Sequence, residues 1–299
     1  MKIKSLIFAL FAAMLLFVAC DVISEDERLG ELNTPLTERT TLLIEFTGNR
    51  CPNCPGAAMI ADELLDTIPN NVVVVAMHPA GLSFTQPITP KVMLQSQEAY
   101  DYLVEFGGNV STGLPVGVVN NREFDKKYLI GSSTWTANVF DLCYVAPDCL
   151  IDLEHSKDGD NHTVTATLMA QSKLDSVSLI FWLVESNIVG PQNMSHALLE
   201  DYKAKHPDAN EKSGAVMNYV HNHVFRSTLN GKWGKELGVL DGEINCPNCG
   251  PIYPTESCTF TIDEKYVADN CAVVAVLINT KTKEVVQAAE IALGAGAAH

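Results

Sequence analysis

The run VVVVAM at residues 72–77 constrains the fold of this chain more than any other stretch of its sequence. β-Branched residues favour strands, and a run without polar alternation indicates a strand that is covered on both faces. A second apolar run, TLLIEFT at residues 41–47, lies upstream, and residues 52–67 between the two runs carry apolar side chains at helical spacing. These features predict a layered α/β arrangement around adjacent parallel strands.

The alternation of strands and helices continues downstream of these two runs. Residues 90–106 carry a helical pattern, and LPVGVVN at residues 114–120 is typical of a strand. A partner strand is expected near residues 124–130, followed by a helix over residues 132–144. The predicted order is therefore β-α-β-α-β-β-α.

A CPNC motif at residues 51–54 lies between the first strand and the first helix. The unpaired N–H groups and the dipole of a helix N-terminus favour a thiolate, so Cys51, next to Arg50, is expected to be the nucleophile. Cys54, further into the helix, is expected to be the more buried resolving thiol. Two alternatives remain: a permanently closed structural disulfide, or a zinc site, which would need two further ligands from elsewhere.

This layout resembles the thioredoxin-like fold. In that family a cis proline begins the third strand of the unit, and a buried acid lies six residues before the first cysteine. Pro115 and Glu45 occupy these places. The resemblance implies that Pro115 faces the cysteine pair and that Glu45 accepts the proton of Cys54; alternatively, the Glu45 side chain points to solvent. The chain departs from the family in having no tryptophan before Cys51.

His78 directly follows the second predicted strand. Because adjacent parallel strands end at the same edge of a sheet, His78 is expected at the rim of the cysteine site, where it would tune the thiolate. The alternative is a polar strand end without a chemical role.

After residue 148 the sequence pattern changes from alternating strands and helices to strand-like runs alone. About seven short strand-like runs follow, many of them alternating apolar and polar residues, with a long polar connection over residues 189–215. The predicted architecture is an α/β thioredoxin-like domain at residues 40–147, followed by an all-β immunoglobulin-like sandwich at residues 148–299.

The N-terminal region predicts export and lipid anchoring. Residues 1–19 combine Lys2 and Lys4 with an apolar stretch, as in a signal peptide, and the ending FVAC resembles a lipoprotein box in which Cys20 is acylated. Residues 20–39 are acidic and lack periodicity, which is typical of a tether. Removal of residues 1–19 deletes two lysines and no acidic residue, so the formal net charge falls from −16 to −18. This acidic balance argues against a nucleic-acid partner.

Eight of the nine cysteines remain if Cys20 carries lipid, and an oxidising compartment makes disulfides the default expectation. Beyond the 51–54 pair, the cysteines predicted to form structural bridges are Cys143, Cys149, Cys246, Cys249, Cys258 and Cys271. Cys143 and Cys149 could close a small loop at the domain junction, whereas Cys258 and Cys271 are not expected to pair. The HNH motif makes His221 and His223 weak metal candidates, with a polar strand face as the favoured explanation.

The whole chain resembles the Omp28-type outer-membrane lipoproteins, through FVAC, EFTGNRCPNCPGA, AMHPAG, LPVGVVN and YVHNHVFRSTLNGKWGKELG. The resemblance implies a lipoprotein of the outer membrane, facing either the periplasm or the cell surface, and held in the membrane lipid by Cys20. Two functions compete: a thiol–disulfide oxidoreductase or redox sensor with a protein or peptide thiol partner, and a non-catalytic surface binding module or adhesin. No cofactor is expected for either.

Overall fold

A computed structural model describes residues 37–242, 244–246 and 250–297 of the chain. Residues from Leu36 onward form one compact unit. The predicted signal peptide, the lipidation site Cys20 and most of the predicted tether lie outside the described residues. No helix among the described residues is both long enough and apolar enough to cross a membrane.

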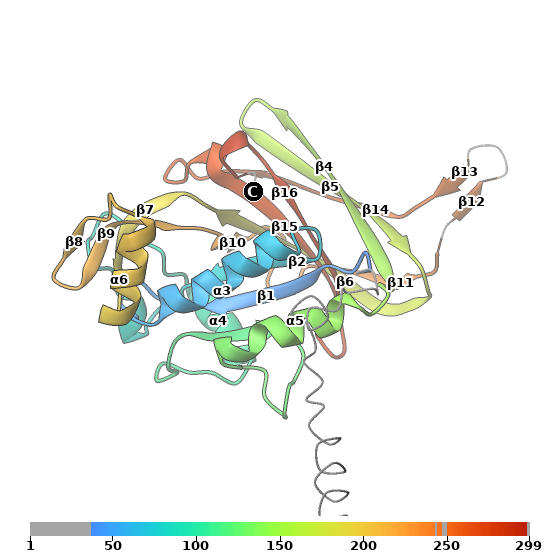
Figure 1. The fold of residues 1–299 in the computed structure, drawn as a ribbon. Coiled ribbons are helices and arrows are strands. Elements are labelled where there is room, and N and C mark those ends of the chain that lie inside the picture. Colours follow the sequence, from blue (N-terminus) through green and yellow to red (C-terminus); the bar gives the residue numbers. More distant parts are fainter. Residues whose placement is uncertain (1–36, 243, 247–249, 298–299) are drawn as a thin grey trace, which may run out of the picture. The chain divides into compact units, whose positions relative to one another are not determined.

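The first part of the chain alternates strands and helices (Figure 1). Its elements are β1 (Thr41–Phe46), α3 (Cys54–Thr67), β2 (Val72–Met77), α4 (Gln97–Glu105), β3 (Val116–Val119) and α5 (Trp135–Cys143). The partner strand predicted near residues 124–130 does not form. Only isolated bridges occur there, Phe124 with Lys127 and Ile130 with Gly117, because the chain turns back on itself within four residues.

The second part is mostly β-structure. Its elements are β4 (Cys149–Asp158), β5 (Asn161–Ala170), β6 (Leu174–Glu185), β7 (Ile188–Asn193), α6 (His196–Lys205), β8 (Glu211–Lys212), β9 (Ala215–His221), β10 (Val224–Thr228), β11 (Lys235–Leu240), β12 (Ile244–Cys246), β13 (Gly250–Ile252), β14 (Thr255–Thr261), β15 (Cys271–Asn279) and β16 (Val285–Ala292). The chain is therefore a mixed α/β structure with mostly β-sheets and few helices. The expected connection at residues 189–215 contains β7, α6 and β8 rather than irregular chain.

One sheet runs through both parts of the chain. Its order is β16-β15-β6-β10-β2-β1-β3, with β11 also paired to β6. β10 lies parallel to β2 on one side and antiparallel to β6 on the other. Strands from both sides of the expected division between residues 147 and 148 are therefore hydrogen-bonded neighbours in one sheet.

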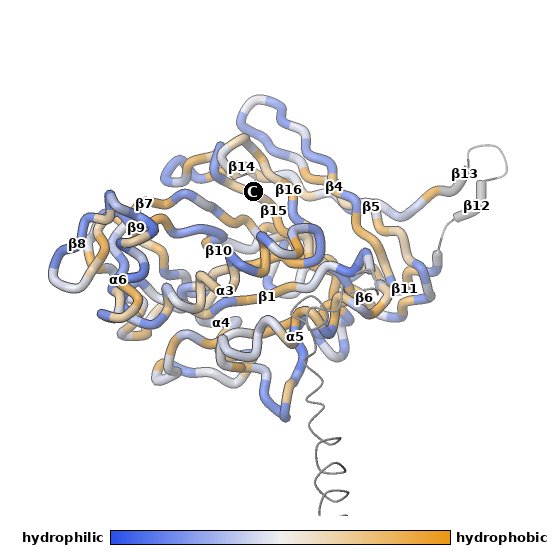
Figure 2. Tube along the Cα trace, viewed as in Figure 1, coloured by the Kyte–Doolittle hydropathy of each residue, from blue (hydrophilic) through white to orange (hydrophobic). Residues whose placement is uncertain are grey.

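β1 and β2 are buried along their whole length because both faces of the sheet are covered there. Leu43 and Val74 point to the face covered by α3 and α5, whereas Leu42 and Val75 point to the opposite face, where α4 packs. Further along the same sheet, β6 and β15 are also buried on both faces. One of these faces packs against the three-stranded sheet β14-β5-β4, which is built around Val164, Ala166 and Leu168. Figure 2 shows the apolar colouring of β15 and the polar tip of the β4–β5 hairpin.

Candidate functional site

The two cysteines of the CPNC motif form a disulfide at the start of α3, with their Cα atoms 5.4 Å apart. Asn53 is the N-cap residue, and Pro55 lies in the first turn of the helix, where its missing N–H costs no hydrogen bond. The helix therefore begins at Cys54 rather than at Pro52 as predicted. Cys51 precedes the cap and is held beside the helix terminus by the disulfide.

Pro115 lies close to the sulfur atom of Cys51. The Leu114–Pro115 peptide bond is cis, as the resemblance to the thioredoxin-like fold implies. The Cys51 sulfur lies 3.4 Å from the carbonyl oxygen of Leu114. Leu114 and Pro115 are both partly exposed and directly precede β3. The structure thus places the predicted proline next to Cys51.

Residues 192–195, which we call the clasp, cover the cysteine loop. The clasp comes from the end of β7 and the start of α6, far from the loop in sequence. Its donors reach all five carbonyl groups of residues 48–52. The bonds are Gln192 Nε2 to Cys51 O (3.0 Å) and Gly48 O (3.3 Å), Asn193 N to Asn49 O (2.8 Å), Asn193 Nδ2 to Arg50 O (3.3 Å), and Ser195 N to Pro52 O (2.8 Å).

The clasp explains why Cys51 is less accessible than expected. Cys51 and Cys54 are each only 1% exposed, although the sequence analysis predicts that Cys54 is the more buried. No local pattern in the sequence marks residues 192–195 as a partner of the CPNC loop. All of these bonds end on backbone carbonyls, which every sequence offers, so spacing and composition do not reveal them.

We expect Gln192→Ala to destabilise the chain and to expose the disulfide. Gln192 is buried, and its amide donates to Cys51 O and Gly48 O. Gly48 O also accepts from Cys51 N, so Cys51 O is the acceptor that the variant leaves without a partner. Leaving a buried acceptor unpaired costs about 1–3 kcal/mol. Urea unfolding should show this loss, and reduction by dithiothreitol should be faster than in the unaltered chain. Gln171→Ala, at an exposed side chain with a single bond, is the control and should change neither measurement. Unchanged reduction kinetics in Gln192→Ala would show that the clasp does not limit access.

Beneath the disulfide, Glu45, Cys54 and His78 line one small cavity of about 50 Å³. Glu45 comes from β1, and His78 directly follows β2, so their strand ends bring them together. Both side chains are buried rather than at the rim or in solvent. The second part of the chain supplies further lining residues, among them His221 and His223.

Burial controls the protonation of these groups. It raises the pKa of Glu45 to about 8, and it lowers the pKa of His221 to about 4. Burial also holds the pKa of His78 well below its ordinary value, with smaller contributions from His221 and Arg226. At neutral pH the cavity therefore contains a protonated carboxyl group and two neutral imidazoles.

The two weak metal candidates do not lie on one face of one strand. β9 ends at His221, and His223 follows it with a φ of 54°, in the turn before β10. Among residues 37–242, 244–246 and 250–297, no three His, Cys, Asp or Glu side chains are arranged to hold a metal ion.

The prediction of structural bridges is wrong for the four other cysteines whose side chains the structure describes. Cys143, Cys149, Cys258 and Cys271 carry free thiols, so Cys143 and Cys149 do not close a loop. Burial raises the pKa of the Cys149 and Cys271 thiols to about 12, so they remain neutral and pack as small apolar groups. Cys249 and the side chain of Cys246 lie outside the described residues.

Two distant likenesses stand among the solved structures that match this chain. A crystal structure of a protein from Agrobacterium tumefaciens is 14% identical, with a TM-score of 0.46, over 87% of this chain and 96% of that chain. A domain of the outer membrane lipoprotein Omp28 from Porphyromonas gingivalis is 17% identical, with a TM-score of 0.31, over 50% of this chain and 89% of that chain. Comparison with curated proteins gives no match.

The family model described as outer membrane protein Omp28 matches residues 107–296. The matched region includes Pro115, the clasp and His221, but it begins after Cys51 and Cys54. Family membership therefore carries no information about the chemistry of the disulfide. Because the match covers more than half of the sequence, this chain belongs to the Omp28 family of outer membrane proteins.

Proposed function

We propose that this chain is a lipid-anchored cell-envelope protein whose thioredoxin-like region cycles between a Cys51–Cys54 disulfide and a dithiol, as a thiol–disulfide oxidoreductase or redox sensor. Cys20 provides the anchor in the outer membrane, and the partner is a protein or peptide thiol. The observation that carries this proposal is the disulfide at a helix N-terminus with the buried, protonated carboxyl of Glu45 in the cavity beside Cys54. A disulfide that serves only as a structural bridge does not open, so it would not require a proton donor beside Cys54.

The exchange reaction follows from this arrangement. A partner thiolate attacks the Cys51 sulfur, the Cys51–Cys54 bond breaks, and its electron pair goes to the Cys54 sulfur. Glu45 gives its proton to that sulfur, because a thiolate buried beside the carboxyl group would be poorly solvated. A second partner thiol then releases Cys51, so that two electrons and two protons pass from the partner dithiol to the pair.

The reduction potential of the 51–54 pair tests the proposal. We expect equilibration with glutathione buffers at a potential above about −300 mV, the region below which structural disulfides are found. Cys51→Ser should abolish disulfide reductase and isomerase activity. Cys258→Ser, which removes a free and partly buried thiol, is the matched control and should retain activity. A potential well below −300 mV would identify a locked bridge.

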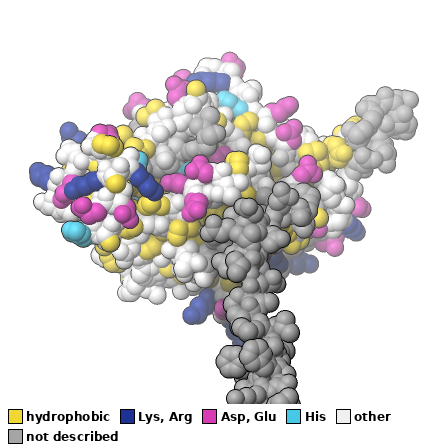
Figure 3. All heavy atoms as spheres, viewed as in Figure 1, with side chains coloured by type: hydrophobic (Ala, Val, Ile, Leu, Met, Phe, Trp, Pro, Cys, Tyr) yellow, Lys and Arg dark blue, Asp and Glu magenta, His cyan; other side chains and the backbone are white. Residues whose placement is uncertain are grey.

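One observation favours the second candidate, a surface binding module without catalysis. Both cysteines are only 1% exposed, and this burial limits the access of a folded partner to the sulfur atoms. On the face shown in Figure 3, acidic side chains are scattered over the surface with basic side chains between them. Digestion of the protein by protease added to intact cells, together with an inert disulfide, would favour this module over the redox protein.

A further inference from the structure

The cavity beneath the disulfide contains polar atoms that have no protein partner. Glu45 Oε1, His78 Nδ1 and His221 Nε2 are each buried without a hydrogen bond to another described residue, and all three residues line the cavity. Buried polar atoms of this kind are normally satisfied by ordered water. A polar cavity of about 50 Å³ has room for a few water molecules, and these three atoms supply the partners that such waters need.

The cavity lies next to a larger groove. It shares lining residues with this groove of about 750 Å³ between α3 and α6, in particular Asp62, Tyr219 and Asn222. Asp62 lies on α3, and Tyr219 lies on β9 two residues before His221. A proton that leaves Glu45 therefore has a polar route past the imidazoles to this groove.

We infer that His78 and His221, through water held in this cavity, relay protons between Glu45 and solvent each time the Cys51–Cys54 disulfide opens or closes. This inference rests on the proposed function and extends it to residues outside the cysteine motif. Both are positioning residues, since neither has to contact the sulfur atoms. Their rings lie edge to face with centroids 6.2 Å apart, a separation that one water can bridge.

The relay balances the exchange reaction. When the disulfide opens, Glu45 transfers its proton to Cys54 and becomes a buried carboxylate, which is costly without a counter-charge. Each imidazole has one unpartnered ring nitrogen in the cavity and is also hydrogen-bonded to backbone, His78 at Ala76 and His221 at Gly190 and Pro191. The unpartnered nitrogen can take a proton from water and give the same proton to the carboxylate. When the dithiol closes, the same steps run in reverse and the proton returns to solvent.

Among the other charged or titratable groups around the imidazoles, Arg226 and Tyr219 are less suited to this role. Arg226 is held by an ion pair to Glu185 at 2.8 Å. Burial raises the pKa of the Tyr219 hydroxyl, which therefore keeps its proton. Asp62 lies where the cavity meets the groove, and its pKa is raised by burial and by Asp66, so it can exchange protons with solvent at the outer end of the route. His223 also lines the cavity, and its backbone N–H donates to Ser186 Oγ at 3.0 Å.

The experiment measures reduction of the full mature chain by dithiothreitol at pH 7. We expect His78→Gln and His221→Gln to slow both reduction and reoxidation by about a hundredfold, the lower end of the range for lost proton transfer. The equilibrium constant with glutathione should stay the same, because a relay accelerates both directions equally. His155→Gln, on β4 and away from the cavity, is the control and should react at the unaltered rate.

A measurement on the unaltered chain keeps the test valid even if a variant folds poorly. Reduction rates in mixtures of H₂O and D₂O should depend on the deuterium fraction along a curve, because several protons move together. A straight line, or folded variants that react at the unaltered rate, would overturn the relay and leave the proposed function standing. If the unaltered disulfide does not exchange with glutathione at all, the proposed function fails and the relay fails with it.

Discussion

A chain divided between residues 147 and 148 is expected to lose its folded structure in both pieces. β10 from the second part lies between β2 from the first part and β6, so the division leaves sheet edges without partners. Further hydrogen bonds cross the same division, from Val285 N to Asn120 O at 3.0 Å and from Thr40 N to Gln287 Oε1 at 2.9 Å. Neither piece keeps the backbone pairing that the whole chain provides.

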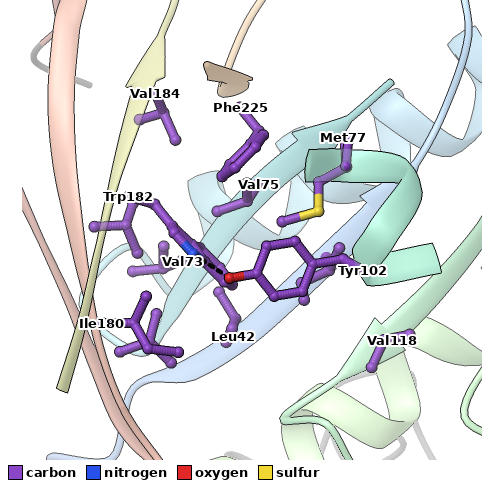
Figure 4. Packing of buried hydrophobic residues seen from close by; sticks show 14 of the residues in the cluster. Leu42, Val73, Val75, Met77, Tyr102, Val118, Ile180, Trp182, Val184 and Phe225 are labelled. Atoms are coloured by element: carbon purple, nitrogen blue, oxygen red, sulfur yellow. Dashed lines mark hydrogen bonds between the residues drawn. The ribbon is translucent and has the colours of Figure 1, made fainter. Parts of the chain in front are cut away.

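The apolar core crosses the division as well. Tyr102 on α4 and Trp182 on β6 pack edge to face with their ring centroids 5.3 Å apart, and Trp182 Nε1 donates to Tyr102 Oη at 3.0 Å (Figure 4). Phe225 on β10 packs against both rings. The side chains of Tyr102 and Trp182 are fully buried in the whole chain. Separation would expose them to water, at a cost in folding free energy of about 25 cal/mol per Å² of apolar surface.

The measurement compares residues 37–147, residues 148–299 and residues 37–299 in urea. The undivided chain should unfold in one cooperative transition, whereas each piece alone should show no transition and should bind a hydrophobic dye. An equimolar mixture of the two pieces is the control for chain cleavage, and it should recover part of the cooperative signal. A native-like transition in either isolated piece would contradict the expectation and support two independent domains.

Local sequence patterns predict the part of the fold that contains the disulfide. The runs at residues 41–47 and 72–77 form β1 and β2, and the strand expected at residues 114–120 forms β3. Their order brings Glu45, Cys54 and His78 to one sheet edge, where the structure places them around one cavity. Each of these inferences depends on neighbouring residues, which is why sequence reasoning reaches them.

What the sequence does not reveal depends on pairing between distant segments. β10 pairs with β2 through Val224 and Ala76, which lie about 150 positions apart in the sequence. Nothing in the residues around Val224 or around Ala76 indicates that the two segments pair. The sequence does not reveal the clasp for the same reason, since residues 192–195 lie far from the CPNC loop in the chain. The HNH motif does single out His221, but its place below the disulfide follows only from the path of β9.

Glu45→Gln is expected to remove the part of the decline in stability between pH 5 and pH 8 that is due to Glu45; Glu290, whose pKa burial raises to about 7, contributes a further part that should remain. The folded chain holds the Glu45 proton up to about pH 8, whereas the unfolded chain releases it near the ordinary value of 4.5. Between these values the native state binds more protons, so the free energy of unfolding falls as the pH rises, by about 1.4 kcal/mol per pH unit. The stabilisation that the folded state gains by holding the Glu45 proton is fully present below pH 4.5 and is lost as the pH rises through 8.

Glutamine has nearly the shape of the protonated carboxyl group and does not titrate. The variant should therefore match the unaltered oxidised chain at pH 5 and exceed its free energy of unfolding by up to about 4 kcal/mol at pH 8. Urea unfolding at both pH values measures this difference. Glu63→Gln, at an exposed position on α3, is the control and should leave the pH dependence in place. If Glu45→Gln follows the same pH profile as the unaltered chain, Glu45 is ionised in the folded protein and cannot donate a proton to Cys54. A variant that gains stability at pH 8 but exchanges its disulfide more slowly would instead show that the chain keeps this destabilising carboxyl for the reaction.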